Sequence, residues 1–243
     1  MTGLNDPKSR LIFALDVPGV DEAVSFVRKL NGSVGMFKVG LELFIKEGPA
    51  VLTAIREHSD AEIFLDLKLH DIPATVERAV QSAAANAVRF LTVHCSGGEA
   101  MLKAAVNGAG TSGLQILGVT VLTSMGPADL DRELGGQRSL RDLVFTRAEL
   151  ALQSGCAGVV CSGEELTRIR QHLADVMTVV PGIRPADSAV TNDDQKRVMT
   201  PREAIQSGAD YLVVGRPIRD AADPKAAADQ IVQEISGALQ ARK

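Results

Sequence analysis

Ionisable residues stand at the end of an apolar run that is typical of a buried strand. Asp66 and Lys68 interrupt the leucine-rich run 63–69, and Asp71 follows it. Side chains on a strand alternate between its two faces, so Asp66 and Lys68 should share one face and the leucines the other. An unpaired buried charge costs roughly several kcal/mol, whereas opposite charges ~4 Å apart recover about 4 kcal/mol at an effective dielectric of about 20. We therefore expect these charges to be paired, with Lys68 kept as an ammonium ion that can act as an acid.

Two earlier apolar runs also deliver charge near their ends. Asp16 closes the run 11–17, and Lys38 stands within the run 36–40. If the three strands are neighbours, Asp16 and Lys38 can join Asp66 and Lys68 in a network in which each charge has an opposite neighbour. The alternative is an amphipathic antiparallel strand whose Asp66 and Lys68 face water. The alternation of strands and helices along the chain disfavours that alternative.

Short apolar runs rich in β-branched residues alternate with stretches of helical periodicity along the whole chain. This pattern indicates βα units around a parallel sheet, and eight strands close a barrel. We predict an α/β fold, a single (β/α)8 TIM barrel in which residues 1–243 form one catalytic domain; a doubly wound open sheet is the runner-up. The expected strands are 11–17, 36–40, 62–69, 90–95, 115–122, 158–162, 177–182 and 211–215. The expected helices are 21–30, 50–58, 74–86, 98–106, 140–153, 164–172, 201–207 and 224–239.

Glycine and arginine occur together where the seventh and eighth predicted strands end. Gly182 is followed by Arg184, and Gly215 by Arg216. Glycine lets backbone N–H groups approach an anion, and arginine offers a planar fork of donors for phosphate oxygens. The loops after strands seven and eight commonly bind phosphate in this type of barrel. Either turn alone is weak evidence, but their joint position predicts a phosphate site.

The longest irregular stretch is 183–199, which is long for a compact barrel and therefore suggests a lid or a binding loop. Gln195 on this loop and Thr123 at the end of the fifth strand could complete a polar substrate pocket. Single polar residues of this kind are, however, more often turn formers.

Composition argues against several classes of partner. The formal net charge is -4, with 45% hydrophobic and 23% charged residues, which gives no general attraction to nucleic acid or to an anionic membrane. No run approaches about 18 apolar residues, and the amino end lacks the apolar core of a signal peptide. We therefore expect a cytoplasmic protein that binds neither nucleic acid nor membrane.

The cysteines and histidines indicate neither a metal site nor a redox centre. Three cysteines are an odd number, and they lack metal-ligand or paired redox spacing, which suits a reducing compartment and ordinary packing. The four histidines show no metal-site spacing, and no glycine-rich dinucleotide fingerprint follows the first strand. We expect no metal and no cofactor. His94, at the end of the fourth strand, is expected to make structural hydrogen bonds.

The segment 64–73, followed by Thr75, closely resembles the signature of the orotidine 5′-monophosphate decarboxylase family. Its Asp66-x-Lys68-x-x-Asp71 core is shared by a wider superfamily of phosphosugar barrels, so the flanking motifs give the resemblance its specificity. These motifs occur in the family's order along the whole chain, at 14–16, 38–40, 93–94, 96–98, 119–124, 181–185 and 215–217.

The resemblance implies a carboxy-lyase that converts orotidine 5′-monophosphate to uridine 5′-monophosphate and CO2 in de novo pyrimidine biosynthesis, without a cofactor. Lys68 would stabilise and protonate the C6 carbanion, Asp66 would lie beside the substrate carboxylate, and Lys38 would join the charge network. The resemblance also implies a homodimer in which Asp71 and Thr75 complete the partner's site. The residues expected to bind substrate are Asp16, Lys38, Asp66, Thr75, Thr123, Arg184, Gln195, Gly215 and Arg216.

Two rival functions remain open at this point. A metal-dependent phosphosugar decarboxylase or lyase of the same superfamily would be expected to offer a carboxylate to magnesium from its second strand, where this chain has Lys38. The ammonium group of Lys38 would repel a metal ion. A catalytically silent phosphate-binding barrel used for regulation is the other rival, and the intact set of charges argues against it.

Overall fold

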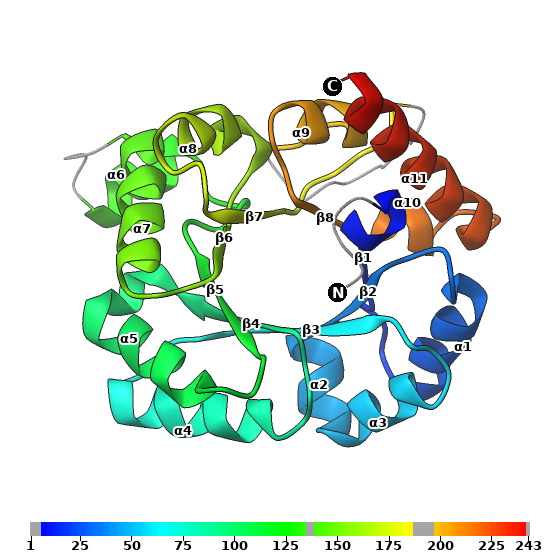
Figure 1. Ribbon diagram of the computed structural model, residues 1–243, viewed down its shortest axis with the longest axis horizontal. Coiled ribbons are helices and arrows are strands. Elements are labelled where there is room, and N and C mark those ends of the chain that lie inside the picture. The colour runs from blue at the N-terminus through cyan, green and yellow to red at the C-terminus, as the bar shows by residue number, and fades with distance from the viewer. Residues whose placement is uncertain (1–5, 135–138, 187–196, 242–243) are drawn as a thin grey trace.

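Eight parallel strands close into a barrel in the order in which they occur along the chain. The computed structural model describes residues 6–134, 139–186 and 197–241. Figure 1 shows the strands gathered in the middle of the molecule and the helices outside them. The strands are β1 (Leu11–Ala14), β2 (Met36–Gly40), β3 (Glu62–Leu69), β4 (Phe90–His94), β5 (Gln115–Val119), β6 (Gly158–Val160), β7 (Met177–Val180) and β8 (Tyr211–Val214). The predicted (β/α)8 barrel is confirmed.

Several strands end earlier than the apolar runs predicted. β1 stops at Ala14 and β5 at Val119, although the apolar residues continue to Val17 and Leu122. The backbone N–H of Leu15 still donates to the carbonyl of Lys38 (2.9 Å), but beyond this point the chain leaves the ladder. The apolar residues past the strand ends remain buried or line a cavity. Strand ends predicted from hydropathy alone are therefore too late.

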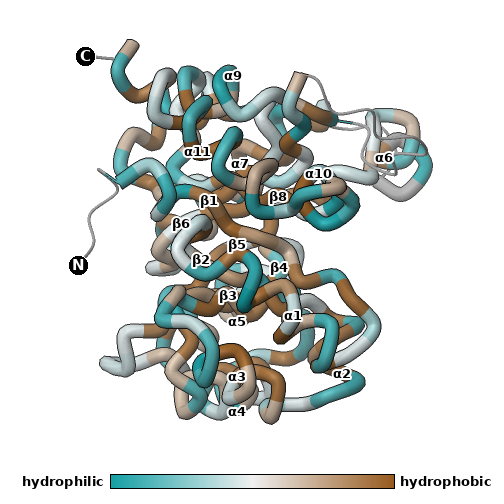
Figure 2. Tube along the Cα trace, turned by 90° about the vertical axis from the view of Figure 1, so that its right-hand side faces the viewer, coloured by the Kyte–Doolittle hydropathy of each residue, from teal (hydrophilic) through white to brown (hydrophobic). Residues whose placement is uncertain are grey.

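Side chains of the strands divide between two cores, as alternation predicts. In β1, Ile12 and Ala14 belong to a cluster inside the barrel, while Leu11 and Phe13 pack outward under the helices. Figure 2 shows apolar residues concentrated along the strands. The inner cluster consists of Ile12, Ala14, Met36, Phe64, Phe90, Leu117, Val179, Tyr211 and Val213. This packed layer fills the barrel and lies beneath the carboxyl ends of its strands, where barrels of this type carry their functional sites.

The helices that follow the strands include all eight that periodicity predicted, with ends shifted by a few residues. In the described part of the chain three further helices, α2 (Leu41–Glu47), α6 (Pro127–Leu134) and α10 (Arg216–Arg219), lie where no helix was predicted. The predicted helices correspond to α1 (Val20–Leu30), α3 (Ala50–Arg56), α4 (Pro73–Ala84), α5 (Gly98–Ala109), α7 (Leu140–Gln153), α8 (Leu166–His172), α9 (Pro201–Gln206) and α11 (Pro224–Ala241). Within the described ranges, no helix is both long and apolar enough to cross a membrane.

β3 departs from regular strand geometry near its end. Lys68 has a φ of 50°, a left-handed conformation that a residue with a long side chain seldom adopts. The pairing with β4 shifts there: Leu65 lies opposite Leu91, but Leu69 already lies opposite Val93. This irregularity was not predicted, since we expected strict alternation through residue 69. Leu67 and Leu69 nevertheless pack against the outer core, as predicted.

Candidate active site

A cavity of about 570 Å³ opens at the carboxyl ends of the strands. Ala14, Phe64, Val160 and Val213, which belong to or pack against the inner core, contribute to its lining. Charged and polar side chains surround these apolar residues, as expected for a site that orients a polar ligand over a dry floor. The polar residues of the lining are Asp16, Lys38, Asp66, Lys68, Thr123, Arg184, Arg216 and Arg219.

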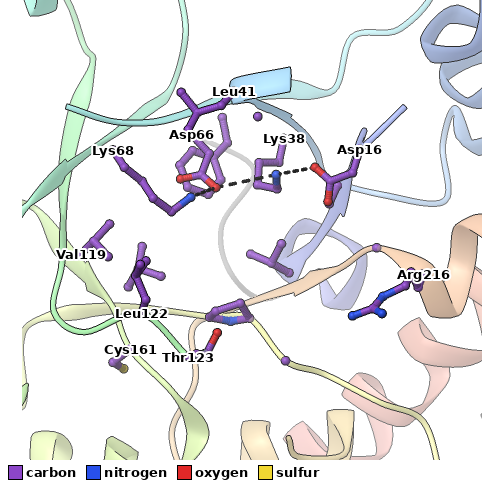
Figure 3. Close-up of a pocket in the computed structure, with 18 of the residues that line it drawn as sticks. Asp16, Lys38, Leu41, Asp66, Lys68, Val119, Leu122, Thr123, Cys161 and Arg216 are labelled. Carbon is purple, nitrogen blue, oxygen red and sulfur yellow. Dashed lines mark hydrogen bonds and ion pairs between the residues drawn. The ribbon is translucent and has the colours of Figure 1, made fainter. Parts of the chain in front are cut away.

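Four of these side chains form a row of alternating charge along one side of the cavity (Figure 3). The Lys38 ammonium lies 3.0 Å from Asp16 Oδ1 and 3.7 Å from Asp66 Oδ2, and the Lys68 ammonium lies 2.7 Å from Asp66 Oδ2. Asp16, Lys38, Asp66 and Lys68 therefore make the compensated network that the sequence predicted. Its middle is the most buried part: the side chains of Lys38 and Asp66 are 10% and 12% exposed, against 51% for Asp16.

The carboxylate of Asp66 is the electrostatic centre of this row. Burial by itself would raise the pKa of Asp66, but the charges of Lys38 and Lys68, with hydrogen bonds from Lys68 and Thr92, hold it below its ordinary value of 3.8. Asp66 is therefore ionised near neutral pH. A fixed anion between two cations keeps both ammonium groups in place at the cavity wall.

Arginines line the part of the cavity next to the ends of β7 and β8. Arg184 follows β7, and Arg216 follows Gly215 at the end of β8. Figure 3 shows Arg216 and Thr123 across the cavity from the charged row. These residues come together as the two glycine-arginine turns predicted, although Gln195 lies outside the described residues. The arrangement suits a ligand with an anionic group at one end.

Sequence reasoning missed Arg219, which also lines the cavity. Its guanidinium donates to the backbone carbonyl of Asp16 (2.9 Å) and pairs with Asp220 (2.7 Å). Arg219 stands three residues after Arg216, and this spacing places both arginines on the short helix α10. Because that helix was not predicted, the spacing could not indicate that Arg219 lies near Arg216.

Comparison with known proteins identifies the family. A model of the "Orotidine 5'-phosphate decarboxylase / HUMPS family" matches residues 9–231. The chain belongs to this family. A relative from Desulfosudis oleivorans, named orotidine 5'-phosphate decarboxylase, is 50% identical over 238 residues, covering 96% of this chain and 95% of the relative. One of the same name from Rhodopseudomonas palustris is 48% identical over 234 residues, covering 96% and 97%.

Solved structures of the decarboxylase / HUMPS family agree with the fold. The crystal structure of orotidine 5'-phosphate decarboxylase from Lactobacillus acidophilus matches with a TM-score of 0.81 and 36% identity, covering 93% of this chain and 98% of that one. The enzyme of the same name from Pyrococcus horikoshii matches with a TM-score of 0.76 and 26% identity, covering 93% and 99%.

Two residues of the family signature lie away from the cavity lining. The side chain of Asp71 is exposed and accepts a hydrogen bond from the backbone N–H of Ile72 (2.6 Å). Thr75 is half-buried in the first turn of α4. Neither is among the residues that line the cavity of this chain. Ile72, which follows Asp71, is a large apolar side chain that is 66% exposed.

His94 is half-buried, and the three cysteines are buried free thiols. The His94 ring lies 5.6 Å from that of His70, and burial lowers the pKa of His94 below 6.5, as do the nearby His70, Lys68 and Arg147. Burial raises the pKa of the Cys95 and Cys156 thiols to about 12, and it also raises that of Cys161 at the cavity edge. Thiols in such surroundings are poor nucleophiles. In the described part of the chain, no three His, Cys, Asp or Glu side chains gather so that they could hold a metal ion.

Proposed function

We propose that this protein converts orotidine 5′-monophosphate to uridine 5′-monophosphate and CO2, a step of de novo pyrimidine biosynthesis. The observation that carries the proposal is the Lys68 ammonium, held 2.7 Å from Asp66 at the wall of the cavity. The names of relatives that are 46–50% identical over almost the whole chain support it. We propose the cytoplasm as the place of action, in keeping with three cysteines that are buried free thiols.

The chemistry requires a cation at one carbon atom. When the bond from C6 to the carboxylate breaks, CO2 leaves and the electron pair stays on C6 in the plane of the pyrimidine ring. Ring resonance cannot spread this pair, so a fixed positive charge must stabilise it. Lys68 provides that charge and gives its Nζ proton to C6, which forms the C–H bond of the product; water then returns a proton to the amine. No electron-accepting cofactor is needed.

The other charges of the row hold Lys68 in position. Asp66 fixes the Lys68 ammonium and faces the substrate carboxylate, and Lys38 neutralises Asp66 from the other side. Asp16 and Lys38 contact the nucleoside, and Thr123 closes the pocket around it. Because this geometry exists before the substrate binds, little reorganisation is left for the reaction step.

The substrate phosphate binds at the arginine side. Arg216, the Gly215 backbone and Arg184 hold it, together with Gln195. Binding energy from a group far from C6 can be used to stabilise a closed, charge-dense site, and it then increases the rate as well as the affinity.

Two substitutions test these roles. Lys68→Ala removes the proposed acid, so it should abolish most turnover and keep the fold, whereas Arg216→Ala should mainly weaken substrate binding. Decarboxylation is followed by the loss of substrate absorbance, with circular dichroism as the fold control; parental turnover by Lys68→Ala would exclude the proposed acid.

We further propose a homodimer in which Asp71 and Thr75 complete the site of the partner subunit. The exposure of Asp71, which does not line the cavity of its own chain, and of the neighbouring large apolar side chain of Ile72 supports this. Asp71 would add a second carboxylate near the partner's Lys68. The test mixes Lys68→Ala and Asp71→Ala chains, because a mixed dimer regains one site with both residues. Different affinity tags on the two chains allow the mixed dimer to be isolated by sequential purification, and absence of regained activity in it argues against the shared site.

The metal-dependent rival is distinguished by a chelator. The position where that rival should offer a carboxylate holds Lys38, whose ammonium is committed to Asp16 and Asp66. A cation at this place repels Mg²⁺. Turnover of orotidine 5′-monophosphate should therefore be the same with and without chelator, and loss of turnover on chelation would favour the rival.

A further inference from the structure

Thr92 lies opposite the irregular end of β3 and is fully buried. Leu65 pairs with Leu91 and Leu69 pairs with Val93, so the three residues 66–68 of β3 face Thr92 alone on β4. A bulge of this kind leaves backbone groups without ladder partners and re-aims the side chains around it. The two side chains re-aimed here are Asp66 and Lys68.

The hydroxyl of Thr92 makes two hydrogen bonds across this bulge. It accepts one from the backbone N–H of Lys68 (2.9 Å) and donates one to Asp66 Oδ1 (2.8 Å). The other oxygen of the same carboxylate, Oδ2, is the one that contacts both ammonium groups, Lys68 at 2.7 Å and Lys38 at 3.7 Å. One hydroxyl thus donates to the Asp66 oxygen that the lysines do not contact, and it accepts from the backbone N–H of Lys68, whose ammonium Asp66 orients.

The two hydrogen bonds of Thr92 stabilise the left-handed backbone of Lys68 and the buried carboxylate of Asp66, each of which is unfavourable by itself. Lys68 is in the left-handed region (φ 50°), where its backbone persists only if the surroundings hold it. The Thr92 bond gives the Lys68 N–H the partner that the shifted ladder no longer supplies. The bond to Asp66 stops the carboxylate from rotating and keeps Oδ2 toward the lysines. It is also one of the interactions that hold the pKa of Asp66 low.

We propose that Thr92 is a positioning residue for the reaction: its hydroxyl fixes the backbone of Lys68 and the carboxylate of Asp66 so that the ammonium faces the reacting carbon. Thr92 is not itself part of the cavity lining. It acts through Asp66 and Lys68, and the inference rests on the roles proposed for those two residues. A buried threonine that only fills a β-strand would contribute to stability and leave the reaction step unchanged.

The decisive variant is Thr92→Val, which keeps the volume and the branching but removes the hydroxyl. Hydrogen bonds to charged groups are worth enough to change a rate by about ten- to a hundredfold. We expect kcat to fall by that factor while KM changes by less than about twofold, because the phosphate contacts are untouched. The acid limb of the kcat–pH profile should move to higher pH, since Asp66 loses a donor that favours its ionised form. Thr92→Ser keeps the hydroxyl and should restore most of kcat and the parental pH profile.

Thr178→Val is the matched control. Thr178 is equally buried and also uses its hydroxyl, accepting from Arg170 (2.8 Å), but it lies near the amino end of β7, away from the cavity. This change should lower the melting temperature and leave kcat and the pH profile as they are. If Thr92→Val does not fold, Thr92→Cys, whose thiol is a weak donor, is measured by the same criteria, and the fall in kcat should be smaller.

The outcomes separate this inference from the proposed roles of the site residues. A folded Thr92→Val, or Thr92→Cys in its place, with parental kcat and pH profile overturns the inference, as does failure of Thr92→Ser to exceed Thr92→Val. An equal fall in kcat for Thr178→Val also overturns it, because the effect would then come from general destabilisation. If Lys68→Ala turns over at the parental rate, the proposed role of Lys68 fails instead, whatever Thr92 does.

Discussion

The charged row gives a stability prediction for Lys38→Met, which replaces a buried ammonium by a flexible apolar side chain of similar length. The Lys38 side chain is 10% exposed, and it contacts Asp16 at 3.0 Å and Asp66 at 3.7 Å. Methionine fills irregular gaps well, so packing is largely kept and the charge is the main loss. Among the residues that the structure describes, Asp66 then retains Lys68 as its cationic partner.

The size of the effect follows from these distances. At an effective dielectric of about 20, unit charges ~3.7 Å apart attract by about 4.5 kcal/mol, but the burial cost of the ammonium disappears with it. The pair with Asp16 adds little, because that carboxylate is half exposed and screened by solvent. Breaking a buried pair costs about 3–5 kcal/mol. Since Lys68 still neutralises Asp66, we expect a loss of about 3 kcal/mol in the free energy of unfolding at neutral pH, at the low end of that range.

The loss should depend on pH. The pKa of Asp66 in the folded protein is below the ordinary value of 3.8, so the stability that its charge contributes is fully present above that value and is lost as pH falls through the folded pKa. Without Lys38 the folded pKa of Asp66 is higher, and the folded variant takes up a proton earlier during acidification. The difference in stability between parent and variant should therefore narrow once pH falls to the folded pKa of Asp66 in the variant, and it should keep narrowing toward the parent's folded pKa, which lies below 3.8.

Urea unfolding at a series of pH values measures this difference. Lys103→Met is the matched control, because Lys103 pairs with Glu99 at 2.6 Å on the surface, where both side chains are more than half exposed. It should lower stability much less, since exposed pairs are screened. A Lys38→Met loss no larger than that of the control, or one that stays constant with pH, would show that the row is not an electrostatic unit.

Three further changes test other parts of the molecule. Arg197→Met should lower the free energy of unfolding by about 3–5 kcal/mol in urea, because it leaves the buried Glu165 without its ion-pair partner; adding Glu165→Leu should restore much of the loss. The imidazole of His94 should titrate below pH 6.5 by NMR, with its signal assigned from the His94→Gln spectrum. The free energy of unfolding should decrease as pH is lowered from 6.5 to the folded pKa of His94, because the unfolded chain takes up the proton first. Gly108→Ala should lower the melting temperature, at a cost of about 1–3 kcal/mol, because a Cβ there would lie 2.5 Å from the carbonyl oxygen of Glu77 on the facing helix.

The barrel was predictable because hydrophobic periodicity marks buried strands and long amphipathic helices well. The short helices were not. α2 begins at Leu41, directly after β2 ends at Gly40, so seven residues had to carry a period of 3.6 with no break before them. α10 spans only residues 216–219, too few for any period to be visible. Such helices are fixed by the barrel on which they pack, and tertiary packing is what a sequence pattern does not contain.

The charged residues were predictable for a different reason. Asp66 and Lys68 interrupt an apolar run, and the cost of burying an unpaired charge forces each to find a partner. Thr92 gave no such signal, because a threonine within the run 90–94 is an ordinary strand residue. Its position only acquires meaning when the shifted pairing of β3 and β4 brings its hydroxyl to the Lys68 N–H. A hydrogen bond between strands depends on register, and register is a property of the closed sheet.

Closure of the barrel also decides whether the two halves of the site can meet. β8 pairs with β1, with Phe13 opposite Val214, so the turn that carries Arg216 lies beside the end of the strand that leads to Asp16. Arg219 bridges them by its hydrogen bond to the Asp16 carbonyl. In an open doubly wound sheet, the alternative that the sequence left open, the first and last strands need not be neighbours. The anion-binding end and the charged row would then face different crevices, whereas in the closed barrel a single ligand can span both.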